Sequence, residues 1–102
     1  MKKTIAIVTG TRAEYGLLKP LIKAIHDADN FNMQLLVTGM HLSEKYGNTI
    51  NEIEADGFPI TSKIDSHLDG DSDIDISNTI AETTKGFAKV LNQLNPDLMV
   101  VL

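Results

Sequence analysis

Arg12 and His41 are the side chains in this sequence best suited to bind an anion, and each follows the same short pattern. The stretch VTGTRAEYG occupies residues 8–16, and VTGMHLSEKYG occupies residues 37–47. In both, Val-Thr-Gly follows an apolar run, and a basic side chain stands two positions after the glycine. Arginine can donate two parallel hydrogen bonds to a phosphate or a carboxylate, and histidine adds a donor that titrates near neutral pH.

The place of both patterns after apolar runs indicates turns at the ends of strands. In an open parallel sheet flanked by helices, ligands bind outside the carboxyl ends of the strands. Gly10 and Gly39 would let the backbone turn sharply or let a ligand approach closely, and the helix after each would direct free N–H groups at the same space. We therefore predict one anion-binding site shared by both turns, although the sequence fits neither the G-x-G-x-x-G fingerprint nor the P-loop.

Each of these side chains also has a purely structural interpretation. Arg12 could be a surface cation paired with Glu14, and Glu14 could be a first-turn acid favoured by the helix dipole. His41 could cap a helix or lie half-buried under a loop. Tyr15 and Tyr46 fit packing roles better than functional ones.

The composition indicates a single small domain. The chain has 102 residues, of which 42% are hydrophobic, enough for a core. The net charge of −5 argues against a general nucleic-acid or anionic-membrane binder. The absence of cysteine excludes disulfides, thiolate metal sites and cysteine nucleophiles. No segment approaches the roughly 20 apolar residues that cross a bilayer, so we expect a soluble cytoplasmic protein.

Apolar patterning predicts four strands that alternate with three helices. The strands are expected at 4–9, 33–38, 58–64 and 97–102, and the helices at 15–28, 43–55 and 76–94. Strands separated by helices need crossover connections, which predicts a parallel sheet with flanking helices. The sequence thus indicates an α/β, Rossmann-like fold.

Local features refine this prediction. Pro20 predicts an irregular start or a bend in the first helix, Gly47 and Asn48 a break in the second, and Pro59 an edge position for the third strand. The acidic segment 65–75 lacks the ligand order of an EF-hand loop, so we expect a solvated loop. The apolar stripes expected to face the core are Leu17, Leu18, Leu21, Ile22 and Ile25 in the first helix, and Ile76, Ile80, Phe87, Leu91 and Leu94 in the third.

Three segments resemble one enzyme family, the UDP-N-acetylglucosamine 2-epimerases. TGTRAEYGLLKPLIKAI resembles the opening of the family, TGMHLSEKYGNTINEIEADGF its Gly-x-His-Leu segment, and LNQLNPDLMVVL the strand before its Gly-Asp-Arg turn. The resemblance covers essentially all 102 residues. It favours the hydrolysing group, since the non-hydrolysing group usually has proline where this chain has Ala13.

The resemblance implies the front part of the N-terminal half of a glycosyltransferase-B-like fold, in which a UDP-sugar binds between two Rossmann-like halves. Residues 1–102 would then be an incomplete N-terminal domain, with the C-terminal domain absent. The full-length relative would convert UDP-N-acetylglucosamine, or a related UDP-sugar, and water into N-acetylmannosamine and UDP. It would need no metal and no cofactor, would form a homo-oligomer, and would bind neither nucleic acid nor membrane.

The chemistry that the resemblance implies is anti elimination of UDP, followed by addition of water to the glycal. Arg12 matches the arginine that contacts the diphosphate, and His41 matches a histidine near the sugar. Glu14 is often aspartate in relatives, and Gly16 replaces a serine that contacts UDP in some of them. The catalytic acids and histidine of the family lie beyond Leu102, so the chain alone is expected to be inactive. The expected substrate-binding residues are Gly10, Thr11, Arg12, Glu14 and His41.

Other functions stay open from the sequence. A non-hydrolysing epimerase would return a UDP-linked product rather than a free sugar. A non-enzymatic flavodoxin-like nucleotide-binding module would share the fold class. A non-functional remnant would aggregate through an exposed strand edge.

Overall fold

The structure is a computed structural model, and it describes residues 2–42, 49–65 and 72–102. Strands and helices alternate along the chain, as the apolar patterning predicted. In chain order the elements are β1 (Lys3–Thr9), α1 (Arg12–Asp27), β2 (Phe31–Thr38), the 3₁₀ helix η1 (Gly39–Leu42), α2 (Ile50–Ala55), β3 (Ser62–Ile64), α3 (Asp73–Leu94) and β4 (Leu98–Val100).

The four strands form one parallel sheet in the order β3-β2-β1-β4. This confirms the predicted parallel α/β fold. Successive strands are added outward from β1 to β3, and the chain then returns to the other side of β1 with β4. A Rossmann sheet has this order, whereas a flavodoxin-like sheet places its third strand on the other side of the first. The topology therefore does not favour the flavodoxin-like alternative.

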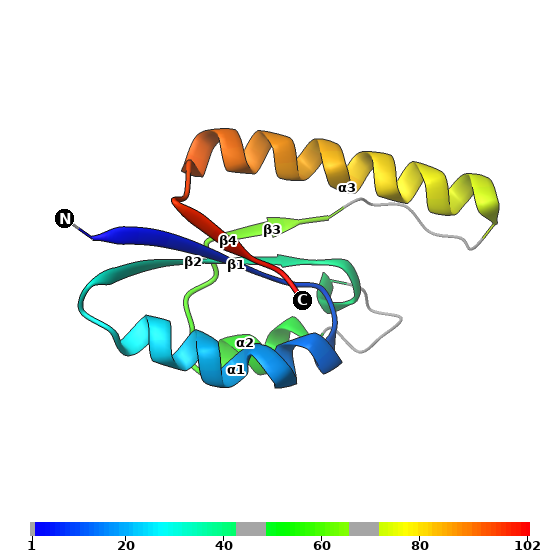
Figure 1. The fold of residues 1–102 in the computed structure, drawn as a ribbon. Helices are drawn as coiled ribbons and strands as arrows, with labels where there is room; N and C mark the ends of the chain where they lie inside the picture. Colours follow the sequence, from blue (N-terminus) through cyan, green and yellow to red (C-terminus); the bar gives the residue numbers. More distant parts are fainter. Residues whose placement is uncertain (1, 43–48, 66–71) are drawn as a thin grey trace.

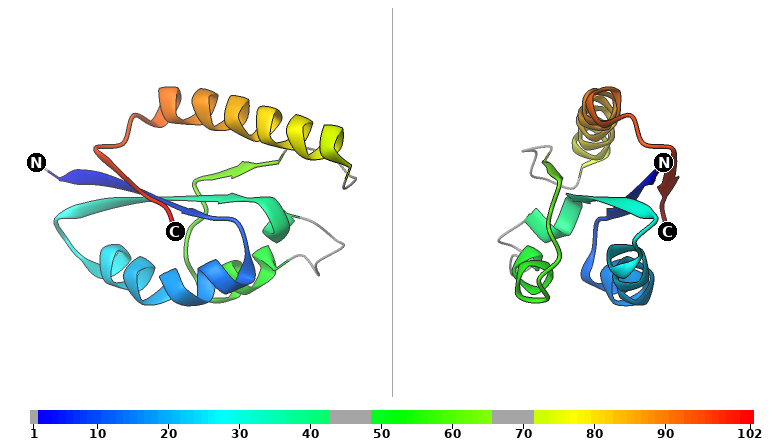
Figure 2. Two further views of the ribbon diagram at one scale, coloured as in Figure 1. Left: turned by 45° about the vertical axis from the view of Figure 1, so that its right-hand side comes forward. Right: turned by 90° about the vertical axis from the view of Figure 1, so that its left-hand side faces the viewer.

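The sheet is the middle of three layers, with α1 and α2 on one face and α3 on the other (Figures 1 and 2). Alternate residues of a strand point to opposite faces, so β1 supplies both cores. Ile5 and Ile7 pack on the side of α1 and α2, while Ala6 packs on the side of α3. All three are buried, which agrees with a strand covered on both faces.

The third strand is shorter than expected and lies at an edge of the sheet, as Pro59 suggested. Only Ser62–Ile64 pairs with β2 as strand. Thr61 extends the contact by other means: its N–H donates to the carbonyl of Leu35 at 2.9 Å, and its hydroxyl accepts from the N–H of Leu35 at 3.1 Å. The fourth strand lies at the opposite edge.

The first helix begins earlier than its apolar stripe and runs through Pro20 without a break. Tyr15 is buried with the leucines and isoleucines beneath the helix, which confirms its packing role. The predicted stripe was too wide, however. Leu17 is 72% exposed and Leu21 is also exposed, because they lie on the side of the helix that faces away from the sheet.

Of the second predicted helix, 43–55, the structure describes only the last part. There α2 begins at Ile50 and ends before Asp56, close to the predicted end. The 3₁₀ helix η1, which was not predicted, comes before this range and directly after β2. Gly57 follows with a φ of +84°, the left-handed conformation typical of a residue after a helix. The predicted break at Gly47 and Asn48, and the packing role of Tyr46, fall outside the described residues.

The third helix begins at Asp73 rather than at 76, so the prediction of a loop up to residue 75 was wrong at its end. Ser72 and Asp75 form a capping box, in which the serine hydroxyl accepts from the N–H of Asp75 at 3.1 Å. Residues 66–71 of the acidic segment fall outside the described residues. The helix ends at Leu94, as predicted, and Asn95 follows it with a left-handed φ of +46°.

Only the second half of α3 packs on the sheet. Phe87, Val90, Leu91 and Leu94 contact the core, whereas Ile76 and Ile80 are exposed, Ile80 by 62%. A helix of 22 residues is about 33 Å long, and the longest strand has 8 residues and spans about 26 Å. The first turns of α3 therefore extend past the sheet (Figure 1). Among the described residues, no helix is both long and apolar enough to span a membrane.

Candidate functional site

The two Val-Thr-Gly turns meet in space, as the sequence predicted. Strands β1 and β2 pair in parallel with Thr9 opposite Val37, so both turns leave the sheet on the same side, at the carboxyl ends of the strands. Gly39 has a φ of +64°, and a Cβ built on it would lie 2.9 Å from the carbonyl oxygen of Gly10. The backbones of the two turns are thus in direct contact, and Gly39 is required both by its conformation and by this approach.

Thr11 and Glu14 cap the N-terminus of α1. The hydroxyl of Thr11 accepts from the N–H of Glu14 at 3.1 Å. The carboxylate of Glu14 in turn accepts from the N–H of Gly10 at 3.2 Å. This arrangement supports the interpretation of Glu14 as a first-turn acid. Its contact with a substrate, like that of Gly10 and Thr11, stays a prediction.

Arg12 is the first residue of α1 and projects toward α2. Its guanidinium lies 3.0 Å from the carboxylate of Glu52, and the side chains are 72% and 43% exposed. The alternative that Arg12 pairs with Glu14 was therefore wrong in the choice of partner. An exposed ion pair of this kind is weak, about 0.2–1 kcal/mol, so an anionic ligand could take the place of Glu52 at small cost.

His41 reaches the same edge of the sheet but is completely buried, with 0% exposure. Its Nε2 lies 2.9 Å from the hydroxyl oxygen of Thr9, and its Nδ1 lies 2.7 Å from that of Thr49. The structure thus brings His41 close to the turn that carries Arg12, yet it engages both ring nitrogens inside the protein. Contact of His41 with a substrate stays a prediction.

The surroundings of His41 keep the imidazole neutral. Burial lowers its pKa below the usual value of 6.5, and the nearby charges of Glu14 and Glu52 and the backbone of Thr11 oppose this only in part. The ring of Tyr15 packs edge-on against it, with 6.2 Å between the ring centroids.

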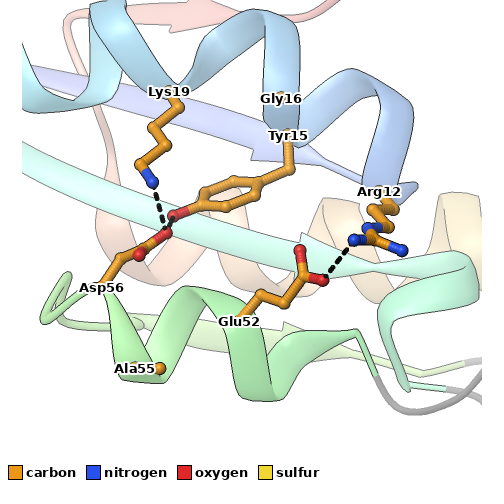
Figure 3. A pocket seen from close by; sticks show the side chains of 7 residues that line it. All are labelled: Arg12, Tyr15, Gly16, Lys19, Glu52, Ala55 and Asp56. Carbon is orange, nitrogen blue, oxygen red and sulfur yellow. Dashed lines mark hydrogen bonds and ion pairs between the residues drawn. The ribbon is translucent and has the colours of Figure 1, made fainter.

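A surface pocket of about 340 Å³ lies between α1 and α2 (Figure 3). Each helix contributes one side of it: α1 supplies the positive side chains, and α2 with the residue that follows it supplies the negative ones. Lys19 and Asp56 form a second ion pair at 3.0 Å beside the Arg12–Glu52 pair. The lining residues are Arg12, Tyr15, Gly16, Lys19, Glu52, Ala55 and Asp56.

Tyr15 closes the floor of this pocket. Its hydroxyl donates to the carboxylate of Asp56 at 2.5 Å. Burial raises the pKa of the Tyr15 phenol strongly, and the hydrogen bond to Asp56 and the charges of Asp56 and Glu52 raise it further. The same hydrogen bond, together with Lys19, lowers the pKa of Asp56. The phenol is therefore a fixed structural donor at neutral pH.

Sequence reasoning missed Glu52, Lys19 and Asp56 as parts of this surface. Their spacing carried a signal: Asp56, the residue that ends α2, stands four after Glu52, and Lys19 stands seven after Arg12 on α1, so each pair lies on one side of its helix. The spacing did not indicate that this face of α1 lies opposite this face of α2. Within the described ranges, no cluster of three or more histidine, cysteine, aspartate or glutamate side chains could hold a metal ion.

Comparison with known proteins gives the family. The profile of the family described as UDP-N-acetylglucosamine 2-epimerase matches residues 23–102. The chain is 38% identical over 102 residues to the UDP-N,N′-diacetylbacillosamine 2-epimerase (hydrolyzing) of Legionella pneumophila, covering 100% of this chain and 27% of that protein. It is 37% identical over 101 residues to the GDP/UDP-N,N′-diacetylbacillosamine 2-epimerase (hydrolyzing) of Campylobacter jejuni, covering 99% and 26%.

A third relative is the polysialic acid biosynthesis protein P7 of Escherichia coli, which is 34% identical over 100 residues, or 98% of this chain and 26% of that protein. The chain spans about a quarter of the length of these relatives. The sequence resemblance, the Rossmann strand order and the family match agree with one another. The chain belongs to the UDP-N-acetylglucosamine 2-epimerase family.

Proposed function

We propose that the complete protein is a hydrolysing epimerase that acts at C2 of a UDP-linked 2-acetamido sugar, and that this chain helps to hold the diphosphate. The observation that carries this proposal is the contact of the two glycine turns at the carboxyl ends of β1 and β2. The N-terminus of α1 and the exposed Arg12 follow directly from the first turn. Helix N-termini and arginines are the groups that bind phosphates in sheets of this kind.

The part of this chain in the reaction is to stabilise the leaving group. When UDP leaves from C1 as C2 loses its proton, negative charge grows on the diphosphate. A guanidinium and a helix N-terminus that face this charge lower the barrier, because both are oriented before the reaction begins. Water then adds to the glycal and gives the free, 2-epimerised sugar. No residue of this chain is assigned a proton transfer.

The names of two relatives point to the substrate to test first, since both are called hydrolysing epimerases of UDP-linked N,N′-diacetylbacillosamine. The complete protein is incubated with this nucleotide sugar and, separately, with UDP-N-acetylglucosamine, and the products are identified by NMR and mass spectrometry. We expect one free sugar and one UDP for each substrate consumed. A UDP-linked epimer without release of UDP would indicate the non-hydrolysing reaction, and no reaction with either substrate would contradict the proposal.

The role of Arg12 is tested by UDP binding to variants of the complete protein. Arg12→Ala removes hydrogen bonds to a charged group, which contribute about 1.5–3 kcal/mol, so the affinity for UDP should fall roughly 10- to 100-fold. Arg12→Lys keeps the charge but loses the paired donors, so its affinity for UDP should lie between those of wild type and Arg12→Ala. Lys23→Ala is the matched control, because Lys23 pairs with Asp27 in the last turns of α1. Wild-type affinity in Arg12→Ala would reject this assignment without rejecting the epimerase.

A further inference from the structure

His41 is held so that no part of its ring is free for a ligand. Among the described residues, Thr9 and His41 are the buried polar side chains, each with 0% exposure. A neutral imidazole has one donor and one acceptor nitrogen, and the hydroxyls of Thr9 and Thr49 engage both, at 2.9 and 2.7 Å. A substrate could reach the ring only after one of these hydrogen bonds had broken.

Each of the two threonines stands just before one member of the Arg12–Glu52 ion pair. Thr9 is the last residue of β1, three residues before Arg12. Thr49 is the N-cap of α2, three residues before Glu52. A threonine at this position usually accepts from a helix N–H, but the hydroxyl of Thr49 makes no such capping bond and instead contacts His41.

We propose that His41 is a positioning residue that links the end of β1 to the start of α2 and thereby fixes the first turn of α1 for diphosphate binding. This inference rests on the proposed function of the site. The imidazole acts through Thr9 rather than by touching the substrate. Its position follows from the left-handed Gly39 turn, which brings η1 back over the end of β1. The buried ring of His41 therefore fixes the first turns of both α1 and α2.

The first test observes the ring itself in the complete wild-type protein. The ¹⁵N chemical shifts of the two imidazole nitrogens distinguish a neutral ring, with one protonated nitrogen, from the charged ring with two. We expect His41 to give one fixed neutral tautomer, and we expect the shifts to stay those of a neutral ring when UDP saturates the protein. Conversion to the charged ring on addition of UDP would mean direct contact with the phosphates and would overturn the proposal.

The second test separates the two hydrogen bonds by substitution. In glutamine the amide reaches the place of Nε2, and in asparagine the place of Nδ1. His41→Gln therefore keeps a partner for Thr9 but loses the one for Thr49. It breaks the link between β1 and α2, so its affinity for UDP should fall, by about three- to tenfold. His41→Asn loses the link to Thr9, and its affinity for UDP should fall about three- to tenfold, the effect of one hydrogen bond.

The decisive variants change Thr9, which is buried and cannot touch the substrate. Thr9→Val keeps the shape but removes the hydroxyl, so it should reproduce the loss seen in His41→Asn. The double variant that combines Thr9→Val with His41→Asn should bind UDP no more weakly than either single variant, because both substitutions remove the same link. Thr9→Ser keeps the hydroxyl and should bind UDP as wild type does, which would tie the loss in Thr9→Val to the missing hydroxyl.

Each result then has a definite meaning. Wild-type UDP affinity in Thr9→Val, together with a loss in His41→Gln, would overturn the proposal in favour of direct contact. Additive losses in the double variant would do the same. If wild-type protein bound no UDP, the proposed function would fall and the positioning role with it, while the ring shifts of the free protein would still report whether the link exists.

Discussion

Replacement of Gly39 by alanine tests the contact on which the whole site depends. Two costs follow from the structure. A residue with a Cβ at a φ of +64° costs about 1–2 kcal/mol. The new Cβ would also lie 2.9 Å from the carbonyl oxygen of Gly10, which belongs to the backbone and cannot rotate away, and crowding of this kind costs typically 1–3 kcal/mol. The free energy of unfolding should therefore fall by roughly 2–5 kcal/mol.

Gly16→Ala is the matched control, because it makes the same chemical change where nothing lies within 4 Å of the new Cβ. Gly16 is inside α1, where alanine should stabilise the helix by roughly 0.5–1 kcal/mol. Gly39→Asn separates the two costs at Gly39, because asparagine tolerates a positive φ better than alanine but still carries a Cβ.

The measurement is the urea midpoint of unfolding for the wild-type protein and the three variants, monitored by far-UV circular dichroism. The affinity for UDP is measured in parallel. We expect the order of stability Gly16→Ala, wild type, Gly39→Asn, Gly39→Ala, from highest to lowest. We also expect weaker UDP binding in Gly39→Ala, because a displaced Gly10 carbonyl moves the turn before Arg12. A Gly39→Ala protein as stable as wild type would refute the close contact between the two turns.

Two pH-dependent predictions follow from the buried groups. Because the pKa of Tyr15 is raised, its phenol stays protonated in the folded protein above pH 10. Wild type and Tyr15→Phe should therefore show the same absorbance rise at 295 nm until alkaline unfolding begins, and a larger rise in wild type before unfolding would contradict this. Because the pKa of His41 is lowered by burial, the unfolded chain binds more protons, so stability should fall as the pH drops from about 7 through the lowered pKa. The difference in urea midpoint between pH 7.5 and pH 5 should be smaller in His41→Gln than in wild type, and an equal difference would mean that another group is responsible.

The sequence was sufficient for the order and type of the elements because the apolar patterns of the strands and helices differ in period. It was also sufficient to place Arg12 and His41 at one edge, since parallel strands end on the same side of a sheet. The capping box at Ser72 and Asp75 was missed because the same acidic composition also fits a solvated loop. The S-x-x-D spacing was the usable signal.

The remaining differences depend on tertiary geometry that no local pattern contains. Ile76 and Ile80 have helical spacing suited to a core, yet they are exposed because α3 is longer than the strands beneath it. Glu52 could not be identified as the partner of Arg12, because the pair depends on how α1 and α2 are rotated toward each other. The burial of His41 likewise depends on the 3₁₀ helix η1, which places the ring between Thr9 at the end of β1 and Thr49 at the start of α2.

The pairing of β1 with β4 has a consequence for synthesis on the ribosome. Ile5 aligns with Leu98, so one side of β1 stays unpaired until residue 98 has been made. At about 5–20 residues per second, this interval is roughly 5 to 20 s. During that time β1, α1 and β2 can already assemble as a unit, with one row of backbone hydrogen-bonding groups still open to other nascent chains. The early unit is therefore a stage at which β1 can pair with the wrong strand.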